Sequence, residues 1–276
     1  MSKKKTAEPP ELTQQHRFPV VGIGASAGGL DALRRFFGAM PPEADVAIVI
    51  VQHLARDKPS LAPELLTKYT SMEVRQVQDE PLVQRNCVYI IPPGKYLSIV
   101  DRRLRLSPIE GPRGAPIAID YFFRALAKDQ RECAVGVVLS GSGSDGTLGI
   151  KAIKEAGGLV IAQEISTAEH VGMPTSAIES GMVDQVLAPE QIPAALIQFA
   201  QHSYIRDAAD IAAVSVPEEN RADDKTQAQS LNAIIGLLLE RGSSDFRNYK
   251  HATLLRRTRR RMCLHHIDHF DDYLQH

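Results

Sequence analysis

Three polar residues that could act together in hydrolysis, Ser26, His53 and Asp145, each follow a short apolar run. Ser26 lies in the stretch Gly-Ile-Gly-Ala-Ser-Ala-Gly-Gly, and Asp145 lies in a second stretch that alternates serine with glycine. A serine hydroxyl is a poor nucleophile until an adjacent base takes its proton. Histidine can act as that base, and a carboxylate can orient the histidine and stabilise its charged form.

The glycine-rich stretch at 22–29 has three interpretations. It matches the GxGxxA fingerprint of dinucleotide sites, but that fingerprint expects an acidic residue where the second apolar run ends in Gln52 and His53. It also fits a turn whose serine only caps the following helix. The third interpretation is a nucleophile turn, because residues 24–28 satisfy GxSxG and small neighbours let a sharp turn present the hydroxyl near helix N–H groups.

The positions of His53 and Asp145 favour the nucleophile turn. The carboxyl ends of parallel strands lie along one edge of an open sheet, so both residues are expected at the same rim as Ser26. Taken alone, Asp145 also fits an N-cap for a helix at 147–156, and His53 fits a structural histidine. The order Ser, His, Asp differs from the Ser, acid, His order of the α/β-hydrolases, so GxSxG does not predict that fold here.

Apolar runs alternate with helical stretches from residue 18 to about residue 201. The runs are apolar at successive positions, as in parallel strands that are covered on both faces. This alternation predicts an α/β domain with a doubly wound, mainly parallel, Rossmann-like sheet that carries the site at its carboxyl edge. Strands are expected at 18–24, 46–52, 87–91, 134–140 and 159–163, helices at 28–37, 60–70, 118–130, 147–156 and 189–201, and a hairpin at 96–100 and 102–107.

Composition divides the chain into four parts. Residues 1–16 are expected to be a disordered lead-in, 17–204 the α/β domain, 205–229 a polar linker, and 230–276 a small all-α module. The formal net charge of −1 favours neither a nucleic-acid binder nor a binder of acidic substrates. Three scattered cysteines, no metal-ligand spacing and no apolar run of about 20 residues predict a cytoplasmic protein without a metal, a cofactor or membrane insertion.

Several motifs, spaced in the right order, resemble the catalytic domain of the chemotaxis protein-glutamate methylesterases (CheB). The resemblance covers about 20–199 and rests on GIGASAGG, VQHL, YIIPPG, LSGSGSDG and IAQEISTAEHVGMPTSAI. It implies a serine hydrolase with Ser26 as nucleophile, His53 as general base and Asp145 as its orienting partner. The implied substrates are glutamyl methyl esters on the cytoplasmic helices of methyl-accepting chemoreceptors, and some members of the family also deamidate glutamine there.

The chain departs from the family pattern beside the nucleophile. Ser142 replaces a methionine whose backbone N–H is implicated in the oxyanion hole of well-studied members, and Ala27 replaces a frequent threonine. The resemblance therefore implies an oxyanion and substrate loop of Ala27, Gly28, Ser142 and Gly143 whose details have changed. Too few residues precede the first expected strand to form a phosphoacceptor receiver domain, so we expect none in this chain.

Residues 231–276 resemble the helical N-terminal domain of the CheR-type receptor methyltransferases. The match lies in FRNYK at 246–250, LLRRTRRRM at 254–262 and FDDYL at 270–274. Residues 246–267 hold seven basic side chains and no acidic one, so an anionic partner is expected. The resemblance indicates an acidic receptor region rather than nucleic acid. No sequence follows for a nucleotide-type domain, so we expect the front part of an esterase–methyltransferase fusion that does not itself methylate.

The leading hypothesis is thus an ester hydrolase in bacterial chemosensory signal transduction. A hypothesis from a different class is a non-catalytic scaffold that binds receptor helices through the basic module. The third hypothesis is a nucleotide-binding protein. A reactive Ser26 would favour the hydrolase, receptor peptides that bind without reaction would favour the scaffold, and a bound dinucleotide would favour the nucleotide-binding protein.

Overall fold

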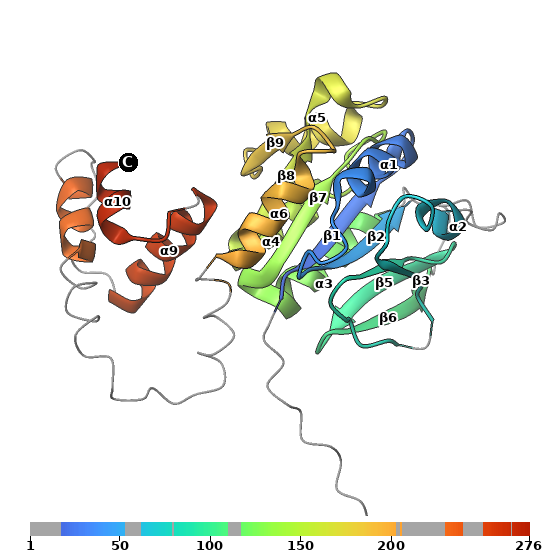
Figure 1. Ribbon diagram of the computed structural model, residues 1–276, viewed down its shortest axis with the longest axis horizontal. Helices are drawn as coiled ribbons and strands as arrows, with labels where there is room; N and C mark the ends of the chain where they lie inside the picture. Colours follow the sequence, from blue (N-terminus) through green and yellow to red (C-terminus); the bar gives the residue numbers. More distant parts are fainter. Residues whose placement is uncertain are drawn as a thin grey trace, which may run out of the picture.

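Seven strands form one parallel sheet in the order β3-β4-β2-β1-β7-β8-β9 (Figure 1). The computed structural model describes residues 18–52, 62–78, 80–109, 117–202, 205, 230–239, 251–265 and 267–276. The strands are β1 (Val20–Ala25), β2 (Ala47–Gln52), β3 (Glu73–Gln76), β4 (Cys87–Ile90), β7 (Ala134–Val138), β8 (Leu159–Gln163) and β9 (Gln185–Leu187). The order reverses between β1 and β7, which confirms the doubly wound sheet expected from the sequence.

Helices cover both faces of this sheet. Successive side chains of a strand point to opposite faces, so Val21 and Ile23 of β1 enter one hydrophobic cluster and Val20 enters the other. The first cluster is closed by α1 (Gly29–Ala39) and α6 (Ile192–Gln201). The second is closed by α3 (Ala118–Gln130), α4 (Thr147–Ala156) and α5 (Gly172–Glu179). Burial on both faces explains why the central strands lack an alternating pattern.

The expected hairpin is present as β5 (Lys95–Val100) and β6 (Arg103–Pro108), which pair antiparallel outside the main sheet. Its apolar residues pack in the cluster that contains α3. Tyr96 of the hairpin also stacks on Tyr121 of α3, with ring centroids 4.9 Å apart. The hairpin therefore covers the outer side of α3 rather than extending the sheet.

Some short elements have no counterpart among the expected ones. These are the edge strands β3 and β9, the helix α5, and two 3₁₀ turns at Arg131–Cys133 and Ile165–Thr167. The edge strands contain mostly partly exposed residues, so their sequences carry no continuous apolar run. Where a helix was expected at 60–70, the structure has only α2 (Ala62–Leu66), with residues 60 and 61 outside the described part.

The described residues of the C-terminal module are helical, as expected. They form a helix at 230–239, α9 (His251–Leu264) and α10 (Phe270–Gln275). The expected lead-in at 1–16 and residues 206–229 of the expected linker lie outside the described residues. Among the helices that the structure describes, none has both the length and the apolar character needed to cross a bilayer.

Helix α9 docks against the α/β domain at the end of α4. The Arg260 guanidinium donates from Nε to the Gly157 carbonyl at 2.7 Å and from Nη2 to the Gly158 carbonyl at 2.8 Å. Gly157 is the C-cap of α4, where a cation also interacts favourably with the helix dipole. Cys263 is buried in the same hydrophobic cluster as Cys133, which precedes β7. Figure 1 shows α9 beside the lower end of the α/β domain, away from α5.

This docking makes the reactivity of Cys263 a reporter of the contact between the two parts of the chain. Burial raises the pKa of the Cys263 thiol to about 12, so the native protein should react slowly with iodoacetamide at pH 8. Arg260→Met removes both hydrogen bonds, each worth about 1.5–3 kcal/mol for a charged donor, and should speed alkylation of Cys263 about tenfold or more. Mass spectrometry of the alkylated peptides measures the rate.

Two controls accompany this prediction. Arg261→Met changes an exposed neighbour on α9 and should leave the Cys263 rate unaltered. Cys87, buried in β4, should stay equally protected in every variant. A wild-type Cys263 that reacts as fast as in urea would show that α9 is not docked.

Candidate active site

Ser26 lies immediately after β1, in a turn held against the end of β7. Its backbone N–H donates to the Ser140 carbonyl at 3.0 Å, and its own carbonyl accepts from Gly29 N–H at 2.9 Å. The N-cap of α1 is Gly28, two residues further along, so the interpretation of Ser26 as a helix cap is wrong. The turn instead leaves Ser26 half-buried between β1 and the start of α1.

Two glycines allow the neighbouring segments to approach the Ser26 turn. Gly28 has φ of +70°, and a Cβ there would lie 2.7 Å from both Glu169 Cβ and Ser140 Oγ. A Cβ at Gly141 would lie 2.1 Å from Met173 Sδ and 3.0 Å from Ser26 Cβ. Any larger residue would collide with these side chains, so the two glycines allow the close packing around Ser26.

The buried hydroxyl of Ser140 joins three segments at this site. Its Oγ contacts the Ala27 carbonyl at 2.9 Å and the His170 carbonyl at 3.3 Å as a donor, and accepts from His170 N–H at 3.0 Å. The Ser140 N–H donates to Gln163 Oε1, at the end of β8, at 2.8 Å. Sequence reasoning missed these roles, although Ser140 and Gln163 both lie in motifs that carry the family resemblance.

Asp145 caps a different helix from the one that follows it. Its Oδ2 accepts from Ile119 N–H at 3.0 Å and its Oδ1 accepts from Asp120 N–H at 2.9 Å, both in the first turn of α3. The N-cap position of α4 is held by Gly146. The interpretation of Asp145 as the N-cap of the helix at 147–156 is therefore wrong, and the carboxylate is half-buried and tied to the start of α3.

His53 lies outside the described residues, so the structure does not test its expected place. The residue before it, Gln52, ends β2 and pairs in register with Ala25, the residue before Ser26. Ser26 and Asp145 follow β1 and β7, the adjacent central strands between which the sheet order reverses. Open α/β sheets bind ligands outside the carboxyl ends of their strands, at the point where the strand order reverses.

The expected oxyanion and substrate loop residues occupy the same edge. Ala27 is exposed and Gly28 half-buried after β1, while Ser142 and Gly143 are exposed after β7. Gly143 also approaches the start of α5 closely, because a Cβ at Gly172 would lie 2.8 Å from Gly143 N. Ala27 and Gly28 therefore belong to the Ser26 turn, and Ser142 and Gly143 belong to the loop between β7 and α4.

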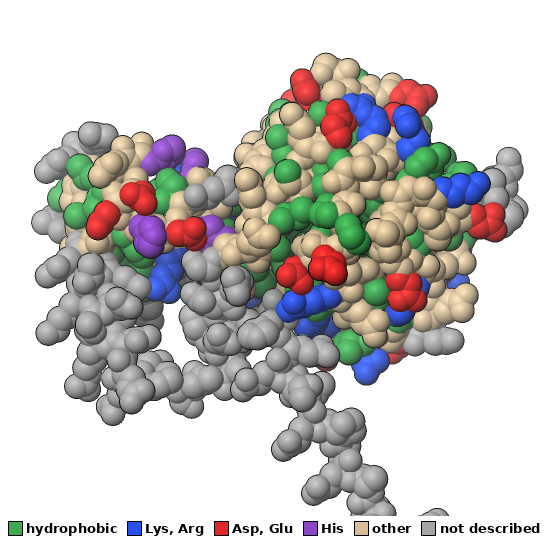
Figure 2. All heavy atoms as spheres, in the orientation of Figure 1, with side chains coloured by type: hydrophobic (Ala, Val, Ile, Leu, Met, Phe, Trp, Pro, Cys, Tyr) green, Lys and Arg blue, Asp and Glu red, His purple; other side chains and the backbone are tan. Residues whose placement is uncertain are grey.

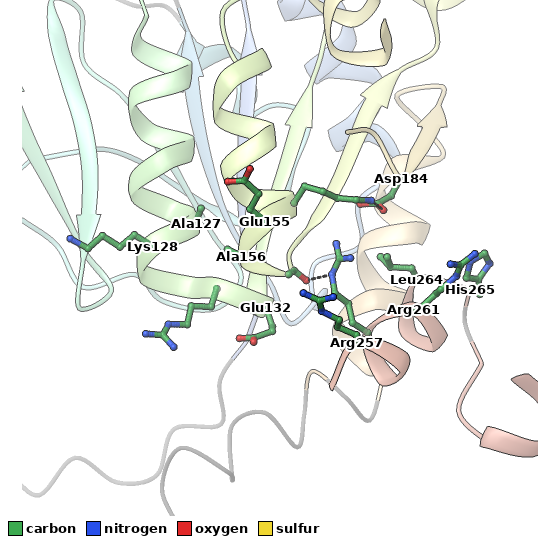
Figure 3. A pocket seen from close by; sticks show the side chains of 14 residues that line it. Ala127, Lys128, Glu132, Glu155, Ala156, Asp184, Arg257, Arg261, Leu264 and His265 are labelled. Carbon is green, nitrogen blue, oxygen red and sulfur yellow. Dashed lines mark hydrogen bonds and ion pairs between the residues drawn. The ribbon is translucent and has the colours of Figure 1, made fainter. Parts of the chain in front are cut away.

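A cleft of about 910 Å³ lies elsewhere, between α9 and the ends of α3 and α4 (Figure 3). Arg257 and Arg261 line it from α9, and Lys154 in it forms an ion pair with Asp184. Two of the basic residues expected to meet an anionic partner thus face this cleft, while Arg260 is bound to backbone carbonyls. On the face shown in Figure 2, acidic and basic side chains are interspersed. No group of three or more potential metal ligands occurs within the described residues.

Two family models match the chain. The CheB methylesterase model matches residues 21–196, and the model of the CheR methyltransferase all-alpha domain matches residues 229–276. The first match contains the whole sheet edge described above, and the second contains the helical module.

Several known proteins are similar to this chain. A putative protein-glutamate methylesterase/protein-glutamine glutaminase of Leptospira interrogans is 33% identical, with 67% of this chain and 97% of that protein covered. An uncharacterized 104.1 kDa protein of Rhodobacter capsulatus is 34% identical over 76% of this chain, which spans only 23% of that protein. The crystal structure of the Thermotoga maritima CheB methylesterase catalytic domain superposes with a TM-score of 0.59 at 29% identity, covering 66% of this chain and 98% of that one.

The packing around Ser26 predicts the effect of a single methyl group. Gly141→Ala would push against Met173 Sδ and Ser26 Cβ, so the serine should be displaced and its labelling by a fluorophosphonate should slow about tenfold or more. Gly38→Ala is the matched control, because a Cβ at this helical position meets no atom within 4 Å. That variant should label at the wild-type rate and gain about 0.5–1 kcal/mol of stability in urea. Equal labelling of both variants would contradict the close packing.

Proposed function

The chain belongs to the CheB methylesterase family, and we propose that it is a serine hydrolase of glutamyl γ-methyl esters on chemoreceptor signalling helices. The match to the family model over residues 21–196 supports this activity. So do the names of relatives from several bacteria as protein-glutamate methylesterase/protein-glutamine glutaminase. The substrate comes from those names and from the resemblance of the motifs to chemotaxis methylesterases.

The proposed first half-reaction forms an acyl-enzyme. Ser26 Oγ attacks the γ-carbonyl carbon of the methyl ester while His53 takes the hydroxyl proton. Backbone N–H groups of the loops after β1 and β7, which include Gly28 and Ser142, are candidates to stabilise the oxyanion. The bond between the carbonyl carbon and the methoxy oxygen then breaks, and His53 returns the proton to release methanol.

Water completes the reaction. With His53 again as base, water attacks the acyl carbon, the bond to Ser26 Oγ breaks, and a glutamate side chain is released. A glutamine side chain follows the same steps with ammonia as the leaving group. Because ammonia leaves less readily than methanol, this reaction depends more strongly on proton donation by protonated His53. Asp145 holds His53 in the required tautomer and stabilises its charged form.

One observation carries this proposal more than any other. Ser26 and Asp145 follow the two adjacent strands at the reversal of the sheet order, and His53 follows the strand that pairs with β1 on its other side. Unlike a helix cap, Ser26 leaves the capping position to Gly28, so its hydroxyl is not needed by α1. A nucleotide site is less favoured, because Gln52 rather than an acid ends β2.

The helical module supplies a second contact in this proposal. Arg257 and Arg261 are exposed on α9 at a spacing of four residues and therefore share one face of the helix. An acidic region of the receptor is the partner that fits these charges and the similarity to the methyltransferase all-alpha domain. This contact would add affinity for the receptor without taking part in the chemistry.

Ser26→Ala tests the activity. Incubating a methylated receptor cytoplasmic fragment with the wild-type chain should release methanol and lower the fragment's mass at each methylated glutamate. Ser26→Ala should lose this turnover by a factor of about 1000 or more, and His53→Ala should be strongly reduced, since both remove members of one catalytic unit.

The control is Ser98→Ala on strand β5, which should keep the wild-type rate. Full turnover by Ser26→Ala would refute the nucleophile. A wild-type chain that binds the receptor fragment but neither releases methanol nor reacts with a fluorophosphonate would instead support the non-catalytic scaffold.

A further inference from the structure

Asp120 is a buried acid beside the site to which the proposed chemistry assigns no role. It lies in the first turn of α3 with only 5% of its surface exposed. Its Oδ1 accepts from Gly149 N–H, in the first turn of α4, at 2.7 Å. A buried acid is costly unless its oxygens are hydrogen-bonded, so its position at the junction of two helices needs an explanation.

The two helices cap each other. The carboxylate of Asp145, just before α4, accepts N–H groups of α3, and the carboxylate of Asp120, within α3, accepts an N–H group of α4. Neither N-cap residue, Ile117 of α3 or Gly146 of α4, makes a capping side-chain bond. Because the first N–H groups of a helix have no partner inside it, each helix relies on the other for this bond.

The reciprocal caps hold the helices in close contact near Ser26. A Cβ at Gly149 would lie 2.4 Å from Phe123 Cβ and 3.2 Å from the Asp120 Cα, so α4 meets α3 at this point without a side chain between them. At the start of α3, Ile119 occupies the space where a Cβ of Gly24 would stand, at 2.5 Å. Gly24 is two residues before Ser26, so the start of α3 contacts β1 next to the Ser26 turn.

We propose that Asp120 is a positioning residue for ester hydrolysis, which fixes the Asp145 carboxylate by holding the start of α4 against the start of α3. This rests on the proposed function, because Asp145 matters to the reaction only as the partner of His53. Without the Asp120 cap, the first turn of α4 loses its acceptor. Asp145 is joined to α4 in the chain through Gly146 alone, so a displaced start of α4 no longer fixes the Asp145 carboxylate. The orientation of this carboxylate toward His53 then becomes less well defined.

The charges around Asp120 show what a substitution has to preserve. Burial raises the pKa of Asp120 above its ordinary range, and the neighbouring Asp145 carboxylate raises it further. The Gly149 N–H and the Arg124 guanidinium on α3 counteract part of this rise. Asp120 therefore stays protonated and neutral up to a higher pH than an ordinary aspartate. Asparagine is also neutral and keeps an acceptor oxygen in the same place.

The test compares two substitutions at this position. Asp120→Ala removes the acceptor and should lower kcat for the methylated receptor fragment about tenfold or more, with KM within about twofold. Asp120→Asn keeps an acceptor for Gly149 N–H and should retain kcat within about threefold. Ile153→Val, which removes one methyl group from the α4 core without touching a cap, should keep the wild-type kcat even where thermal stability falls.

The acid limb of the pH–rate profile distinguishes a specific effect on the Asp145 carboxylate from a general loss of structural stability. A misaligned Asp145 stabilises the protonated His53 less, so Asp120→Ala should shift this limb to lower pH than Asp120→Asn, which has the same change of charge. Equal kcat values and equal limbs for Asp120→Ala and Asp120→Asn in an active protein would overturn the role of Asp120 alone. A wild-type protein without Ser26-dependent hydrolysis would overturn the proposed function and this role together.

Discussion

The buried hydroxyl of Ser140 is the contact on which the geometry of the sheet edge around Ser26 depends. It connects the turn after β1, the loop after β7 and the segment before α5, through Ala27 and the backbone of His170. Ser140 itself is fully buried, so its hydroxyl would be costly to leave without a hydrogen-bond partner. The Ser26 turn is thus held by hydrogen bonds from neighbouring segments rather than by its own sequence alone.

The parallel sheet supplies the frame for these bonds. Its central strands are buried on both faces, and their carboxyl ends carry the loops where chain direction and sheet order change. Gly28 and Gly141 then leave room for the side chains of Ser140, Glu169 and Met173 beside the Ser26 turn.

Sequence patterns predicted the elements with long apolar runs and missed those without them. The central strands and α3 and α4 were correct to within a few residues, because their burial leaves a clear pattern. Strands β3 and β9 lie at sheet edges with partly exposed residues, which carry little signal. The sequence correctly predicted that Ser26 and Asp145 lie at one edge of the sheet. It could not predict that Asp145 caps α3, because Asp145 is separated from Asp120 by 25 positions and from Ile119 by 26. The role of His53 and the domain boundaries stay predictions.

Helix α4 extends from the sheet edge that carries Asp145 to the helical module and sets the distance between them. Its first turn is capped by Asp120, and its last carbonyls accept the Arg260 guanidinium. The ten residues of α4 extend about 15 Å, so the start of α4, next to Asp145, and the cleft beside α9 are separated by a distance of that order. On a straight helical partner this distance corresponds to about ten residues, or about three turns. On the proposed receptor helix, the two surfaces would therefore contact positions about ten residues apart.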